Sequence, residues 1–425
     1  MQITIEKPRL GIPISLIVDD SVPCINALYY FNAQVGNEKD QHHHQFIPLD
    51  FIDQFVEVCS RQGIRGKFTI LPYPAGLGTL LERWEGCDRN DIQRWLDTAR
   101  SAITPQFDIT PEILTHTLAL DLRTHQLIPE AEHLWMANRT QAELTDYMGM
   151  AVQLLRQAGF APAGITQPCF FNGDREAYTH AVLDALRPEG HDPAGYVTFY
   201  FTDSTPEVLP VTPHPVVLLD RERGQAVVSI LDYTDDYFWN TQWPGALPVG
   251  EPEDRLISAD GQTGRLVDLI HNGAWVVFTT HWQSLYANGT CQGLDGLGEV
   301  AARLRRTFGS QLVWMKNSQI ARYRATEESC QITNPHDQDA AWLHLDSAFD
   351  CPDFTFTIGS SELPDGGIER IQLASLGKEA QPLTRDMSLD GLLMPGSWRL
   401  TKAGLSVCLN LMRGVQELRY ERTTS

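Results

Sequence analysis

Short runs of apolar and β-branched residues alternate with amphipathic helical stretches over the first three quarters of this 425-residue chain. This alternation predicts an α/β architecture with a largely parallel sheet. The predicted strands cover residues 14–18, 67–71, 113–119, 164–167, 196–201, 226–231, 275–280 and 311–315. The predicted helices cover residues 49–62, 91–101, 140–158, 174–186, 261–272 and 294–308. About seven to eight strands with helices between them predict a distorted (β/α) barrel.

The helical period fades after about residue 325. The segments beyond it are short and are separated by Gly, Pro, Asp and Ser, which is typical of antiparallel strands. We therefore predict a (β/α) barrel over residues 1–325 and a small β-rich C-terminal domain over residues 326–425. In the alternative interpretation, the last hundred residues are decorations packed on the barrel without an independent fold.

The charge balance disfavours several classes of partner. Lysine and arginine total 33 against 54 acidic residues, a formal net charge of −21, which repels nucleic acid and anionic membrane surfaces. The chain has no long apolar run and no secretory leader at its start, so we expect a cytoplasmic protein. Its 8 cysteines form no CxxC pair, and we expect most of them to be ordinary buried thiols.

Two adjacent carboxylates, Asp19 and Asp20, follow the first apolar strand. In a (β/α) barrel the carboxyl ends of the strands form the active-site face, so acids at this position are placed for catalysis. Neighbouring carboxylates can divide the work, one binding a metal and the other acting as a base. The alternative is a polar turn with an aspartate that caps a helix.

Histidines end or interrupt two further apolar runs. His116 lies in the third predicted strand and His281 ends the seventh. An imidazole at a strand end is a suitable ligand for zinc. For each histidine taken alone, a hydrogen-bonded core residue is the alternative, but two histidines and two aspartates at strand ends indicate a site.

These motifs in this order resemble the polysaccharide deacetylase superfamily of the carbohydrate esterase family 4 type. The resemblance rests on Val-Asp-Asp at 18–20, His-Thr at 116–117, a proline after the fourth strand and Thr-His at 280–281, and it spans roughly residues 10–325. It implies Asp19 as general base, Asp20 and His116 as metal ligands, and His281 as the general acid. It also implies a divalent metal, for which we expect zinc.

The chain departs from the family pattern at two positions. Leu120 stands where the second motif has another metal-binding histidine, and Gln167 stands where the third motif has an arginine that orients the base. The candidate replacements for the missing ligand are Asp121, His125 and the histidine run 42–44, from which we take His44 as the third ligand.

Aromatic residues follow several predicted strands. We expect Tyr73, Trp239 and Trp282 to bind substrate by stacking on sugar rings, although each alone could serve packing. The expected function is metal-dependent hydrolysis of an amide, such as an N-acetyl group, in a small carbohydrate or oligosaccharide. Two alternatives stay open: a glycoside hydrolase using carboxylates such as Asp20 and Asp236, and a sugar-binding protein that has lost catalysis. The oligomeric state, including a homo-oligomer, is also left open.

Overall fold

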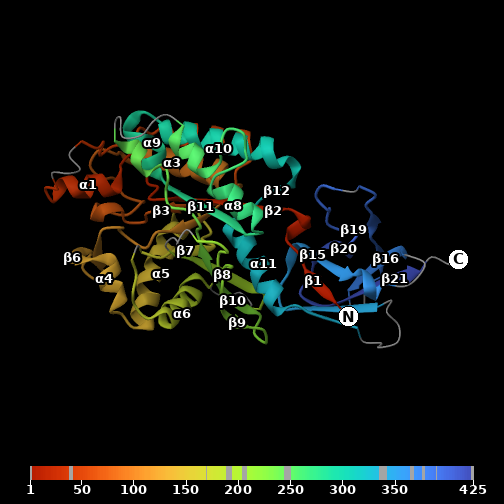
Figure 1. Cartoon of the computed structure of the whole chain (residues 1–425). Coiled ribbons are helices and arrows are strands. Elements are labelled where there is room, and N and C mark those ends of the chain that lie inside the picture. The colour runs from red at the N-terminus through yellow and green to blue at the C-terminus, as the bar shows by residue number, and fades with distance from the viewer. Residues whose placement is uncertain are drawn as a thin grey trace.

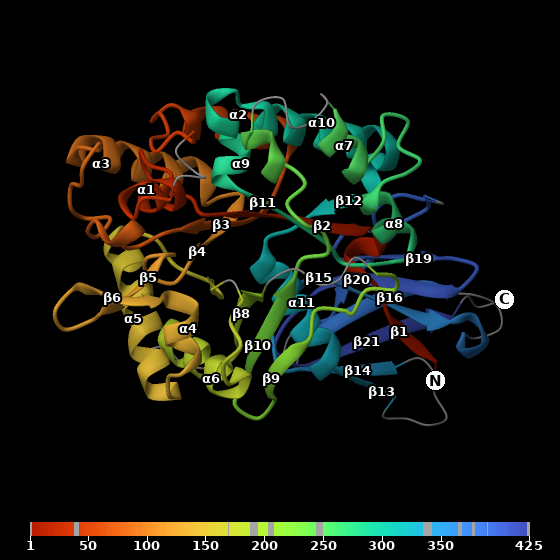
Figure 2. The same cartoon turned by 60° about the vertical axis from the view of Figure 1, so that its left-hand side comes forward.

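The computed structural model describes residues 2–37, 42–168, 170–187, 194–202, 208–243, 250–334, 342–363, 368–375, 379–388 and 390–422. Helices and mostly parallel strands make up the larger part of the molecule, and a β-rich part lies at its side (Figure 1). The turned view in Figure 2 shows helices α2, α9 and α10 over one sheet and helices α4, α5 and α6 beside another. The predicted α/β class is therefore confirmed.

The first parallel sheet is organised around strand β2. Its order is β11-β2-β3-β4, and β12 pairs with the first residues of β2. The strands are β2 (Ile12–Asp19), β3 (Gly66–Ile70), β4 (Phe107–Pro111), β11 (Val276–His281) and β12 (Leu312–Trp314). Nearly all of their residues are buried, as expected for parallel strands that are covered on both faces.

A second sheet has the order β7-β8-β10-β9. Its strands are β7 (Gly164–Thr166), β8 (Tyr196–Thr202), β10 (Gln225–Leu231) and β9 (Val216–Asp220). The first three run parallel, and β9 pairs antiparallel with β10. A separate hairpin joins β5 (Leu118–Asp121) to β6 (Gln126–Ala131). Strands β6 and β9 were not predicted. Both are partly exposed return strands; β6 has no strong apolar run, whereas the Val-Val-Leu-Leu run of β9 was not interpreted as a strand.

The predicted barrel is not closed by ladders among the described residues. The two sheets meet at one seam through the hydroxyls of Thr110 and Thr166, which lie 3.3 Å apart. At the other seam, Tyr233 N donates to Val277 O at 3.0 Å. Isolated contacts at these seams take the place of continuous pairing, so the architecture is that of two adjoining sheets.

The third predicted strand, at residues 113–119, was wrong. Strand β4 ends at Pro111, residues 112–117 form an irregular loop, and only Leu118 and Ala119 of the predicted strand lie in a strand, β5. Ile113 has φ 41° and His116 has φ 62°, values in the left-handed region that a strand does not adopt. His116 therefore lies on a loop rather than within a strand.

The helices agree with several sequence signals. They are α1 (Ala27–Gln34), α2 (Phe51–Gln62), α3 (Arg89–Thr98), α4 (Glu132–Ala137), α5 (Gln141–Gln157), α6 (Arg175–Leu186), α7 (Glu251–Leu256), α8 (Arg265–His271), α9 (Trp282–Tyr286), α10 (Gln292–Phe308) and α11 (Asn317–Ser329). Thr140 and Glu143 form a capping box at the start of α5, and Gly63 ends α2 with φ 71°. Among the described residues, no helix combines the length and apolar character needed to cross a membrane.

The described residues of the β-rich part form two sheets. One has the order β1-β15-β20-β19-β18 and the other β13-β14-β21-β16-β17. Their strands are β1 (Ile3–Ile5), β13 (Gln331–Thr333), β14 (Trp342–Ser347), β15 (Cys351–Gly359), β16 (Ile368–Ser375), β17 (Gln381–Pro382), β18 (Thr384–Arg385), β19 (Ser397–Leu400), β20 (Gly404–Leu411) and β21 (Gly414–Arg422). Strand β1 pairs antiparallel with β15 and lies among the blue strands of Figure 1. Helix α11 runs across residue 325, where we placed the domain boundary, and that division stays a prediction.

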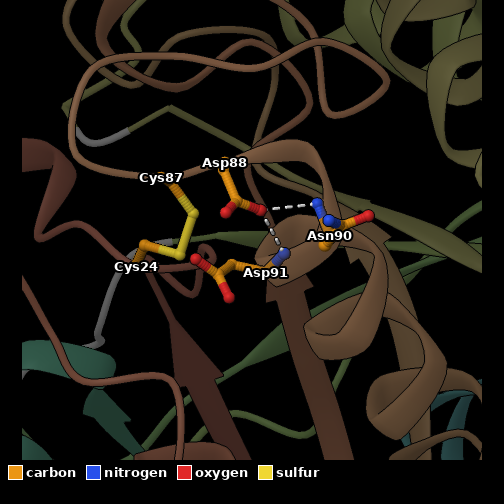
Figure 3. Close-up of a disulfide and its surroundings, with 5 residues drawn as sticks. All are labelled: Cys24, Cys87, Asp88, Asn90 and Asp91. Carbon is orange, nitrogen blue, oxygen red and sulfur yellow. Dashed lines mark hydrogen bonds between the residues drawn. A yellow bond between two sulfur atoms is a disulfide. The ribbon is translucent and has the colours of Figure 1, made fainter.

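A disulfide joins two loops beside the first sheet. Cys24 follows β2, Cys87 precedes α3, and their Cα atoms are 5.7 Å apart. Figure 3 shows the bond next to Asp88, whose carboxylate caps α3 by accepting from the amides of Asn90 and Asp91. This pair is an exception to the expectation that most of the cysteines are ordinary thiols, and five other described cysteines form no disulfide. Disulfides persist mainly in oxidising compartments, so the bond does not support the cytoplasmic localisation that we expected.

Loss of this disulfide is expected to destabilise the fold. A cross-link between cysteines 63 residues apart restricts the unfolded chain, and the chain-entropy model gives a contribution on the order of 4 kcal/mol. Urea unfolding of a Cys24→Ser/Cys87→Ser variant should show a lower free energy of unfolding, whereas Cys330→Ser, at an unbonded cysteine, should change it little. Equal stability of the double variant and the wild type would contradict this prediction.

Candidate active site

The carboxyl ends of β2 and β11 open into a cavity of about 560 Å³. The parallel register places Asp19, the last residue of β2, opposite His281, the last residue of β11. Both side chains line the cavity. The two residues that the sequence analysis proposed as base and acid therefore lie on neighbouring strands at one edge of the sheet.

Asp19 is held by a lysine that the sequence analysis did not select. Lys67 lies on β3 with a fully buried side chain, 0% exposed, and its Nζ is 2.7 Å from Asp19 Oδ1. Lys67 Nζ also donates to Thr166 Oγ1 at 2.6 Å. Burial raises the pKa of Asp19, and the charge of Lys67 opposes this effect. A lysine within an otherwise apolar strand was the available signal for this ion pair.

Asp20, Glu112 and His116 form a compact group next to this ion pair. One potential ligand atom from each residue lies within 4.8 Å of the others. His116 Nε2 is 3.0 Å from Asp20 Oδ1, and His116 Nδ1 is 3.1 Å from Glu112 Oε1. Two carboxylates and an imidazole are a donor set that fits a divalent cation.

The backbone and its neighbours orient these carboxylates. Asp20 has φ 62°, which turns the chain immediately after β2, and its amide donates to Glu112 Oε2 at 2.8 Å. Thr69 Oγ1 donates to the same oxygen at 3.1 Å, and Gln283 Nε2 donates to Asp20 Oδ2. Burial alone would lower the pKa of His116, but Asp20 and Glu112 outweigh it and raise the pKa to about 10.

His281 is oriented by Asp236. His281 Nδ1 is 2.9 Å from Asp236 Oδ2, and the same oxygen accepts from Ser284 Oγ at 2.6 Å. Because Nδ1 is engaged, Nε2 is the ring nitrogen left for proton transfer. Burial would lower the pKa of His281, but the bond to Asp236 and the nearby carboxylates raise it to about 10.

His44, our proposed third ligand, does not belong to this group. Its side chain is exposed, its Nδ1 is 3.5 Å from Tyr286 Oη, and its amide donates to Asn288 Oδ1. Glu112 stands in the place that we assigned to it. Glu112 was not predicted as a ligand, because we interpreted the residues that follow it as a strand.

The three predicted aromatic residues have different surroundings. Trp239 lines the cavity, with its ring centroid 5.1 Å from that of His281. Trp282 is only 1% exposed and packs against core rings such as that of Phe51, so it cannot stack on a substrate. Tyr73 is buried and lies against His125 rather than at the cavity. Phe170, which is 80% exposed, lines the cavity instead.

Known proteins offer only weak likeness to this chain. No family model and no curated protein matches it. A proposed polysaccharide deacetylase from Mycobacterium smegmatis is similar to 79% of this chain and 100% of its own, with 13% identity and a TM-score of 0.46. A structure described as T48 deacetylase with substrate matches 73% of this chain and 90% of its own, with 9% identity and a TM-score of 0.34. The xylanase Xyn30A from Clostridium acetobutylicum matches 99% of this chain and 99% of its own, with 8% identity and a TM-score of 0.29. At such scores, function has to be argued from the geometry of the site.

Asp236→Asn should lower the pKa of His281 from about 10, because the variant removes the charge that stabilises the imidazolium. NMR titration of the imidazole signals would measure the shift, and Trp239→Phe, which leaves the carboxylate in place, is the control. The raised pKa of His281 means that its protonation stabilises the folded state. This contribution is fully present below the usual pKa of 6.5 and is lost as the pH rises through about 10. An unchanged His281 titration in Asp236→Asn would show that the carboxylate does not set its pKa.

Proposed function

We propose that this protein is a metal-assisted hydrolase that cleaves an amide bond, such as an N-acetyl group, in a carbohydrate substrate. The observation that carries the proposal is the register of β2 and β11, which sets Asp19 opposite His281 at one cavity. A carboxylate base and an imidazolium acid on adjacent strand ends can serve the attacking water and the leaving group of the same bond.

Asp19 is the proposed general base. Its bond to Lys67 holds one carboxylate oxygen and favours the ionised form, while burial raises the pKa. The second oxygen is available to accept a proton from the attacking water. Lys67 takes the orienting role that an arginine before Pro168 has in the family that the sequence resembles.

His281 is the proposed general acid. With a pKa of about 10 it carries a proton at neutral pH, which it can donate to the departing amine. Asp236 holds the ring by Nδ1 and stabilises its positive charge. The donated proton goes to the leaving nitrogen, which therefore departs as a neutral amine and not as an anion when the acyl–nitrogen bond breaks.

Asp20, Glu112 and His116 are the residues that would hold the metal. A bound divalent cation would polarise the acyl oxygen and lower the pKa of a water molecule. The group is next to the base because Asp20 directly follows Asp19. Zinc is the ion that we propose first, and the two carboxylates also suit harder ions such as Mn²⁺.

Two features of the cavity support a carbohydrate substrate. Trp239 and Phe170 offer ring surface that can stack on the apolar face of a sugar. Asp232 and Asp235 also line the cavity and can accept hydrogen bonds from hydroxyl groups. The glycoside hydrolase alternative is less well supported, because Asp20 and Asp236, the carboxylates considered for it, are each bonded to a histidine.

Asp19→Asn should reduce hydrolysis by about 10²-fold or more, because the amide cannot accept the proton of the attacking water. The assay is acetate release from N-acetylated chito-oligosaccharides, with circular dichroism and metal content as checks that fold and metal group persist. Full activity in this variant would overturn the assignment of the base. New reducing ends without acetate would favour the glycoside hydrolase instead.

The metal group makes a separate prediction. After loading with Zn²⁺ or Mn²⁺ and dialysis, elemental analysis should find about one ion per chain. His116→Ala and Glu112→Ala should each lose it, because each removes one donor of the group. His44→Ala is the matched control at the exposed histidine and should keep the ion. If Glu112→Ala kept the ion and His44→Ala lost it, the ligand set predicted from the sequence, Asp20, His116 and His44, would be the correct one.

A further inference from the structure

The loop that carries His116 has an unfavourable backbone conformation. Ile113 and His116 both have positive φ angles, which cost energy for residues with a Cβ, above all for a β-branched residue such as isoleucine. Such a backbone persists only where its surroundings determine it strongly. The side chain of His116 must nevertheless lie within hydrogen-bond distance of both Asp20 and Glu112.

A buried carboxylate from another element binds this loop. Glu132 Oε1 accepts from the amides of Leu114 at 3.2 Å and Thr115 at 3.1 Å, and Glu132 Oε2 accepts from the amide of His116 at 3.0 Å. Tyr147 Oη donates to Glu132 Oε1 at 2.7 Å. Three successive amides that converge on one carboxylate form an anion-binding nest whose anion is supplied by the protein itself.

The hairpin after the loop brings Glu132 to this position. Leu118 at the start of β5 pairs with Ala131 at the end of β6, so the chain returns beside the loop after one turn. Glu132 follows directly as the first residue of α4, and its amide donates to Thr117 O at 3.0 Å. Tyr147 on α5 accepts from the Leu120 amide and so links the same hairpin to the carboxylate.

We infer that Glu132 is a positioning residue that fixes the backbone of residues 114–116 and thereby aims the imidazole of His116 at Asp20 and Glu112. Glu132 is only 3% exposed and both of its carboxylate oxygens accept bonds from the loop amides, so it acts through the loop and not on a substrate. Its effect on cation binding rests on the proposed function, whereas its effect on the loop backbone does not.

The test compares two buried carboxylates that both accept backbone bonds. Glu132→Gln keeps the shape but replaces one acceptor oxygen with an NH₂ group, which faces amide donors and cannot accept from them. Asp108→Asn is the matched control, because Asp108 on β4 is buried and accepts from the amide and hydroxyl of Ser318, away from the loop. Tyr147→Phe is a milder variant that leaves both oxygens of Glu132 in place and removes the hydroxyl that bonds to Glu132 and to the Leu120 amide.

Two measurements distinguish an effect on the loop backbone from an effect on metal binding. Hydrogen exchange of the 114–116 amides should be faster in Glu132→Gln and unchanged in Asp108→Asn. Titration calorimetry with Zn²⁺ should show affinity lower by about 10- to 100-fold in Glu132→Gln, the range found when groups that orient a metal ligand are lost. Should Glu132→Gln fail to fold, Tyr147→Phe is expected to show the same changes to a smaller extent.

Unchanged exchange at residues 114–116 in a folded Glu132→Gln or Tyr147→Phe variant would overturn the inference. Equal losses of Zn²⁺ affinity in Glu132→Gln and Asp108→Asn would also overturn it, because they would show a general loosening. If the wild type binds neither Zn²⁺ nor Mn²⁺ while Glu132→Gln exchanges faster at 114–116, the positioning role stands and the metal-assisted mechanism fails.

Discussion

The site depends on the parallel pairing of strand β2. Strands β11, β3 and β12 all run parallel to it, so their carboxyl ends point to the same side of the sheet. The register with β11 sets Asp19 opposite His281, and the left-handed turn at Asp20 then directs the next carboxylate towards β4 and the loop after it. A slip of one residue in this ladder would turn the side chain of Asp19 to the other face of the sheet.

The charged side chains of the candidate site are paired with side chains of opposite charge. Lys67 contacts Asp19, Asp236 contacts His281, and Asp20 and Glu112 contact His116. Because a buried charge without a partner is costly, loss of one member of a pair would penalise the other as well. The cation that pairs with Asp19 comes from the neighbouring strand β3.

The fold was predictable where local pattern and tertiary environment agree. Strands β2, β3, β7, β8, β10, β11 and β12 all correspond to predicted apolar runs, because buried parallel strands read as short apolar segments. The prediction failed at residues 113–117, where apolar residues occupy a loop that is held by Glu132 and not by strand partners. It also missed the pairing of β1 with β15, because nothing in a short segment specifies a partner more than 300 residues away.

The sequence by itself determined which strand ends carry reactive groups: Asp19, Asp20 and His281 follow apolar runs, and parallel strands bring such ends together. Only the tertiary structure decided which side chains complete the site. Lys67 and Glu112 belong to the site through contacts across strands and loops, although neither was predicted. His44 and Trp282 were predicted there but lie on an exposed loop and in the core. The physical reason is that burial and ion pairing depend on neighbours distant in the chain, whereas a strand end is marked locally by its own residues.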